Sequence, residues 1–79
     1  MAIEEGDVVT RVRMGFSKVL DAQIDTETRG RVCRVVNPDS SFMVRFEGAS
    51  QCVLQFADSL TKVDGDGPNC LDHPSCKVA

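Results

Sequence analysis

Tryptophan and tyrosine are absent from this chain, and its aromatic residues are limited to four phenylalanines. This scarcity disfavours sites that depend on aromatic cages or on base stacking. Apolar runs are short, and none approaches the roughly 20 residues of a membrane-spanning helix, so we expect no membrane partner. A single histidine and the lack of a glycine-rich phosphate loop leave little material for catalysis. We therefore expect no cofactor and favour a non-catalytic protein, with an enzyme kept as an alternative.

Positive charge is also in the minority, because nine Lys and Arg stand against twelve Asp and Glu and the net charge is −3. An acidic balance is not typical of a dedicated nucleic-acid binder. The N-terminal segment is acidic and lacks an apolar run, so we expect no secretory leader and predict a cytoplasmic protein. The four cysteines should then be reduced thiols, and even a Cys70–Cys76 disulfide, which the short spacing allows, is disfavoured.

What the chain does contain is a series of short β-type segments in its central part. Residues 32–36 are rich in β-branched side chains, and residues 42–47 alternate between an apolar face and a face with charged side chains. The turn-forming residues 37–40 between them predict a hairpin. The alternation assigns three side chains to a core, namely Phe42, Val44 and Phe46.

Residues 52–56 form a third alternating run. One of its faces carries Cys52, Leu54 and Phe56, and the other carries Val53 and Gln55. Three antiparallel strands with one apolar face need a cover, which the first segment of the chain can supply. Residues 6–14 predict a further strand, and residues 57–63 predict a 3-10 turn followed by a short fifth strand.

The stretch 15–28 departs from this pattern because its apolar residues recur at helical spacing. These residues are Phe16, Val19, Leu20 and Ile24. The spacing predicts one or two helical turns, and the alternative is an irregular loop whose apolar side chains contact a partner. Six consecutive turn-forming residues at 64–69 mark the end of the folded unit. We therefore predict one domain over 1–63 and a flexible tail over 64–79.

The order of four motifs resembles that of the SH3-like small β-barrels. The motifs are Gly6-Asp7-x-Val9, Gly30-Arg31-Val32, Val44-Arg45-Phe46-Glu47 and Phe56-Ala57-Asp58-Ser59-Leu60-Thr61-Lys62-Val63. The resemblance implies an all-β, five-stranded barrel, here with a short helical or irregular insertion and a flexible C-terminal tail. That fold serves many unrelated functions, so it does not assign one.

Two families within this group are similar to the chain. The small stromal SH3-like subunit of photosystem I has a Val-Arg-Phe-Glu strand and a similar ending, and we carry over its fold and not its role. The type II dihydrofolate reductases of plasmids and mobile gene cassettes are similar in length, and they form tetramers around one pore lined by Val-Gln-Ile-Tyr. The strand here reads Val53-Leu54-Gln55-Phe56, which moves the glutamine to the other face and removes the tyrosine hydroxyl.

The tail offers the one metal-like spacing of the sequence, formed by Cys70, His73 and Cys76. Cysteine and histidine are both ligands that zinc accepts. A structural zinc site normally takes four ligands, however, and this run supplies three. We therefore expect no metal in the tail.

Arginines gather in the predicted strands, and four of them could share an outer face of a small barrel: Arg11, Arg13, Arg31 and Arg45. Such a face could bind an acidic protein or an RNA backbone, or it could be a solvated face paired with carboxylates. We predict a self-associating interaction or assembly module that uses this face and the apolar residues of 15–28. The alternatives are a ligand-binding oligomer or enzyme with its site at a symmetric interface, and nucleic-acid binding through the arginines.

Overall fold

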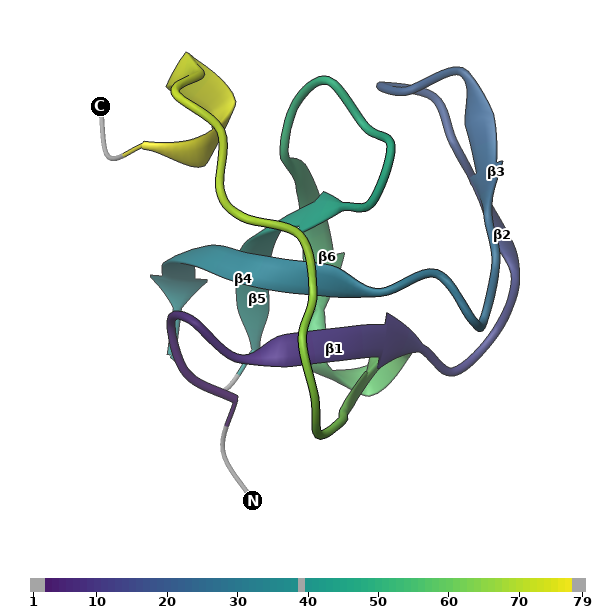
Figure 1. Cartoon of the computed structure of the whole chain (residues 1–79), viewed down its shortest axis with the longest axis horizontal. Helices are drawn as coiled ribbons and strands as arrows, with labels where there is room; N and C mark the ends of the chain where they lie inside the picture. Colours follow the sequence, from purple (N-terminus) through teal and green to yellow (C-terminus); the bar gives the residue numbers. More distant parts are fainter. Residues whose placement is uncertain (1–2, 39, 78–79) are drawn as a thin grey trace.

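The computed structural model describes residues 3–38 and 40–77, so Asp39 of the predicted turn and the chain ends at 1–2 and 78–79 lie outside the described residues. Within the described part, one antiparallel sheet has the strand order β6-β5-β4-β1-β7. Its strands are β1 (Val8–Arg11), β4 (Gly30–Asn37), β5 (Ser41–Phe46), β6 (Val53–Phe56) and β7 (Leu60–Lys62) (Figure 1). The all-β prediction is confirmed, and the sheet is open, with β6 and β7 at its ends.

A two-stranded ribbon replaces the predicted helix of residues 15–28. Strand β2 (Gly15–Ser17) pairs antiparallel with β3 (Ala22–Ile24), and Figure 1 shows this β2–β3 ribbon beside the main sheet. The turn between them is closed locally, because the N–H of Leu20 donates to Oγ of Ser17 at 3.2 Å and Asp21 adopts a φ of 52°. The helical prediction was therefore wrong, since the apolar spacing came from two strands and their turn.

The core lies on the inward face of the sheet and is closed by one residue of the ribbon. Phe42, Val44 and Phe46 of β5 are all buried, which confirms the face predicted for this strand. Gly30 allows close packing here, since a Cβ at this position would lie 2.7 Å from Cγ1 of Val44. The other buried members of this cluster are Val9, Ile24, Val32, Val53 and Leu60.

The end of the sheet follows the prediction for residues 57–63. A 3-10 turn, η1 (Ala57–Ser59), leads into β7, and a second 3-10 turn, η2 (Pro74–Cys76), lies near the C-terminus. In residues 3–38 and 40–77 there is no helix with the length and hydrophobicity needed to cross a membrane.

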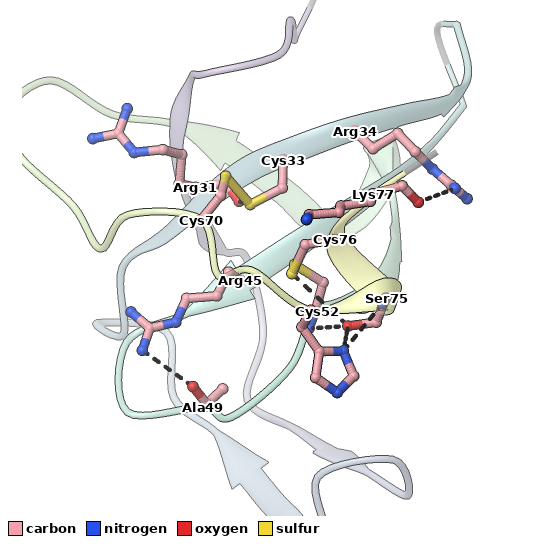
Figure 2. The surroundings of a disulfide bond; sticks show 11 residues. Arg31, Cys33, Arg34, Arg45, Ala49, Cys52, Cys70, Ser75, Cys76 and Lys77 are labelled. Atoms are coloured by element: carbon pink, nitrogen blue, oxygen red, sulfur yellow. Dashed lines mark hydrogen bonds between the residues drawn. A yellow bond between two sulfur atoms is a disulfide. The ribbon is translucent and has the colours of Figure 1, made fainter. Parts of the chain in front are cut away.

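The C-terminal segment is attached to the outer face of the sheet by two disulfides. Cys33 of β4 is joined to Cys70, and Cys52, just before β6, is joined to Cys76 (Figure 2). We call residues 68–77 the C-terminal strap. The prediction of reduced thiols was wrong for this structure, because the sheet places Cys33 and Cys52 directly beneath the strap. The flexible-tail prediction did not foresee this attachment, and the cytoplasmic location stays a prediction.

Candidate functional site

A groove of about 290 Å³, lined by both polar and apolar side chains, lies between the β2–β3 ribbon and β6. Four large side chains line it, and all are strongly exposed: Phe16 (59%), Val19 (60%), Leu54 (47%) and Phe56 (56%). We call this feature the β6 groove. Single exposed apolar residues are ordinary on protein surfaces, but several in one concave patch are typical of a binding site.

The exposure of the β6 side of the groove follows from the pleat of that strand. Val53 (3% exposed) and Gln55 (7%) point to the core, so Leu54 and Phe56 must point outward. Gln55 is thus turned away from its exposed neighbours, as expected for a glutamine displaced by one position. Strand β6 also ends the sheet and contains no charged residue or proline. Natural edge strands are commonly protected by such residues, and β6 carries none of them.

Arg11 at the end of β1 forms the polar rim of the groove. Its Nη1 donates to Oε1 of Gln55 at 3.0 Å, and its Nε donates to the carbonyl oxygen of Arg13 at 3.1 Å. The guanidinium also packs on Gly15, where an added Cβ would lie 2.8 Å from Nη2. These contacts fix a cation beside exposed apolar side chains, an arrangement suited to a carboxylate or carbonyl acceptor on a partner.

The ribbon is held next to the loop that precedes β6. Gln51 donates from Nε2 to the carbonyl oxygen of Val19 at 3.2 Å. Leu20 is partly buried against the core, and Ile24 is 3% exposed. Of the four apolar residues predicted as contacts in this stretch, Phe16 and Val19 are therefore accessible, whereas Ile24 serves the core. Sequence reasoning missed Leu54 and Phe56, although their alternation with Val53 and Gln55 was visible.

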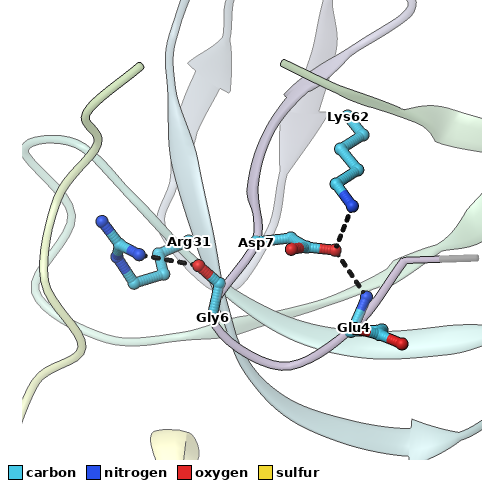
Figure 3. A network of polar contacts seen from close by, with 5 residues as sticks. All are labelled: Glu4, Gly6, Asp7, Arg31 and Lys62. Atoms are coloured by element: carbon cyan, nitrogen blue, oxygen red, sulfur yellow. Dashed lines mark hydrogen bonds and ion pairs between the residues drawn. The ribbon is translucent and has the colours of Figure 1, made fainter. Parts of the chain in front are cut away.

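The arginines predicted to share one face are divided between two places. Arg31 and Arg45 are direct cross-strand neighbours on β4 and β5, while Arg11 lies at the β6 groove. Arg31 donates from Nε to the carbonyl of Pro68 at 2.8 Å and from Nη1 to that of Gly6 at 2.7 Å, the second contact being drawn in Figure 3. Two of its three guanidinium nitrogens are thus engaged within the chain.

Two other arginines bind the C-terminal part of the chain, and a third binds the loop between β5 and β6. Arg29 donates from Nη1 to the carbonyl of Asp64 at 2.7 Å, and Arg34 donates from Nη1 to that of Lys77 at 2.7 Å. Arg45 donates from Nη2 to the carbonyl of Ala49 at 3.1 Å, as Figure 2 shows. Because these guanidinium groups bind backbone carbonyls, the nucleic-acid hypothesis gains no support and stays an untested prediction.

The carboxylate of Asp7 organises the start of β1. Its Oδ2 accepts from the backbone N–H of Glu4 at 2.7 Å and lies 3.3 Å from Nζ of Lys62, as drawn in Figure 3. The ion pair joins the residue that precedes β1 to the last residue of β7, the neighbour of β1 in the sheet. Partly exposed pairs of this kind contribute little to stability, and we assign this one a structural role.

The sulfur atoms of three buried cysteines gather beneath the strap. The Sγ atoms of Cys33, Cys52 and Cys76 all lie within 4.8 Å of one another, and Met43 and Leu71 pack against them. This group shares only Cys76 with the metal-like spacing of the tail, Cys70, His73 and Cys76, at which no metal was expected.

His73 instead positions the turn that carries Cys76. Its Nδ1 accepts from the backbone N–H of Ser75 at 3.1 Å, which caps η2. Oγ of Ser75 in turn accepts from the N–H of Cys52 at 2.8 Å. Among the described residues, the group of potential metal ligands is therefore Cys33, Cys52 and Cys76, and His73 is not a member of it.

Comparison of the chain with protein-family models, with curated proteins and with solved structures gives no match. The site must therefore be interpreted from its own geometry.

Proposed function

We propose that this chain is a self-associating assembly module of the SH3-like barrel type, which uses the β6 groove as its interface. Support for the fold assignment comes from five antiparallel strands with a two-stranded insertion after the first and a 3-10 turn before the last. The observation that carries the functional proposal is the groove itself, in which Phe16, Val19, Leu54 and Phe56 are all about half exposed or more.

A second copy of the chain is the proposed occupant, because an unprotected edge strand can pair with its own symmetry mate. Antiparallel pairing of two β6 strands about a two-fold axis at Gln55 would set Leu54 of one copy opposite Phe56 of the other. This register keeps both outward faces on the same side of the joined sheet. An isologous contact of this kind closes at a dimer.

The charges beside the groove also fit a second copy. Arg11, Arg13 and Asp58 line one shared hollow at this end of the molecule, so each copy presents both signs of charge. Within residues 3–38 and 40–77, the recorded ion pairs involve neither Arg13 nor Asp58. A two-fold axis would allow each Asp58 to meet an arginine of the other copy, which favours self-recognition over an acidic or basic partner.

Light scattering over a range of concentrations tests the proposal. We expect wild-type protein to be a dimer, and Leu54→Glu to weaken the association by at least about tenfold because it places a charge in the apolar contact. Val36→Glu is the matched control, since Val36 is 46% exposed on β4 but does not line the groove. Phe16→Ser tests whether the β2–β3 ribbon contributes to the interface, because it changes an exposed side chain of the groove and leaves the core residue Ile24 in place.

The proposal would be overturned by a wild-type protein that stays monomeric at high concentration. It would also be overturned if Leu54→Glu and Val36→Glu associated equally well. A stable tetramer would instead favour the alternative of a shared pore, and a titration with NADPH would then show whether the pore binds a nucleotide cofactor.

A further inference from the structure

The two disulfides of the chain lie close to each other, although neither bond needs the other to form. Sulfurs from both disulfides lie together, since Cys33 belongs to one and Cys52 and Cys76 to the other, with all three Sγ atoms within 4.8 Å. Cys70 is bonded to Cys33, so the fourth sulfur lies one covalent bond from this group. The two disulfides therefore lie next to each other under the strap, with the sulfur of Cys33 close to both sulfurs of the Cys52–Cys76 bond.

We propose that this cluster is a zinc site when its disulfides are reduced, with Cys33, Cys52, Cys70 and Cys76 as the four thiolate ligands. Zinc binds thiolate sulfur at about 2.3 Å in a tetrahedron, which places the sulfurs about 3.8 Å apart. On reduction, the two sulfurs of each former disulfide, Cys33–Cys70 and Cys52–Cys76, must separate from bonded contact to about 3.8 Å. Cys33 needs to approach Cys52 and Cys76 by at most about 1 Å. The proposal is independent of the self-association proposed above.

The surroundings of the cluster suit a closed structural site. Cys33, Cys52 and Cys76 are each no more than 7% exposed, and Met43 and Leu71 cover them with apolar atoms. The loop before β6 and the strap are already joined by the hydrogen bond from the N–H of Cys52 to Oγ of Ser75, at 2.8 Å. Cys70 itself is exposed, so the site would be closed to water by its four protein ligands, the feature that distinguishes structural from catalytic zinc, and not by burial alone.

Four basic residues lie in the surroundings of the cluster, where a four-thiolate zinc centre would carry a charge of −2, and the guanidinium groups among them are directed away from the sulfurs. Figure 2 shows Arg31, Arg34, Arg45 and Lys77 around the two disulfides. Arg31 and Arg34 flank Cys33 on the same strand, and Arg34 is held by its bond to the carbonyl of Lys77. Such outer groups tune the affinity of a metal site.

The chemistry balances with a dithiol as the reductant. Two equivalents of dithiol transfer four electrons and four protons to the two disulfides, which yields four thiols and two oxidised dithiol molecules. Binding of one Zn²⁺ then displaces the four thiol protons. The strap is therefore fixed by covalent bonds in the oxidised chain and by the metal in the reduced chain.

Titration of the reduced full-length protein with Co²⁺, followed by displacement with Zn²⁺, tests the proposal. We expect one metal per chain, an intense visible absorption typical of four thiolates around cobalt, and no binding to the oxidised chain. Each Cys→Ser substitution should weaken zinc binding by roughly 100-fold, a quarter of the binding free energy of a structural site. His73→Asn, which keeps a side-chain acceptor at the cap of η2, should leave binding unchanged.

A second readout avoids dependence on variants that could fail to fold. In wild-type reduced protein, equimolar Zn²⁺ should protect all four thiols from alkylation, as counted by mass spectrometry. The proposal is overturned if the reduced chain binds no metal, if one or more thiols remain reactive with zinc present, or if His73→Asn weakens binding as strongly as a cysteine substitution.

Discussion

Arg11 donates from Nη1 to Oε1 of Gln55 across 3.0 Å, which connects residues 44 positions apart. Their strands, β1 and β6, are not neighbours, because β5 and β4 lie between them in the sheet. The bond therefore requires the sheet to curl until these two strands approach each other. It also fixes the cation at the β6 groove, so one contact serves both the fold and the proposed interface.

Removal of this contact should destabilise the protein in a non-additive way. Arg11→Met leaves the amide of Gln55, which is 7% exposed, without its donor and should cost about 1–3 kcal/mol in the free energy of unfolding. Arg11→Met combined with Gln55→Leu should cost less than the two single changes together, since no polar group is then left unpaired. Urea unfolding of the four proteins gives the coupling free energy. Additive effects would contradict the role assigned to this bond.

Truncation of two neighbouring residues of β6 should affect different properties: the stability of the fold at Val53 and self-association at Leu54. Val53→Ala should cost about 1–3 kcal/mol because Val53 is 3% exposed and its removal leaves a cavity. Leu54→Ala should cost less than about 0.5 kcal/mol, because Leu54 is 47% exposed, but it should weaken self-association. Unfolding and light scattering on the same two variants separate these effects. The reverse ranking in stability would show that β6 presents its other face.

Gly30 should tolerate no side chain. A Cβ there would lie 2.7 Å from Cγ1 of Val44 and 2.9 Å from Cδ1 of Phe46, both of which are buried in the core. We expect Gly30→Ala to cost about 1–3 kcal/mol through overpacking. Gly15→Ala is the comparison variant and should cost less, because its closest contact, at 2.8 Å, is the Arg11 guanidinium, which can move, whereas the core side chains around Gly30 cannot. Equal losses in thermal unfolding would argue against this packing.

Each disulfide should stabilise the chain to a similar degree. The bonds Cys33–Cys70 and Cys52–Cys76 span 37 and 24 residues, for which loop entropy gives about 3–4 kcal/mol each. Paired Cys→Ala variants, unfolded in urea with a metal chelator present, measure each contribution. We expect the longer loop to contribute slightly more. Unchanged unfolding midpoints in both paired variants would contradict a stabilising role for the strap.

The central hairpin shows what local sequence can specify. Alternation predicted that Phe42, Val44 and Phe46 face the core, and all three are buried. A side chain's face on a strand depends on the pleat, which is a local property. The same reasoning grouped Leu54 with Phe56 but could not tell which face of β6 is inward, because that depends on the strand's neighbours.

Sequence alone determined the all-β character and the turn and short strand at 57–63, whereas the structure decided which apolar residues of the ribbon, Phe16 and Val19, are accessible. Tertiary structure decided the rest of the candidate sites. The groove needs β6 and the ribbon side by side, and the cysteine cluster joins β4, the loop before β6 and the strap. Spacing along the chain predicts contacts within a segment, whereas these sites are formed by segments far apart in sequence, which approach only when the sheet curls and its core is buried.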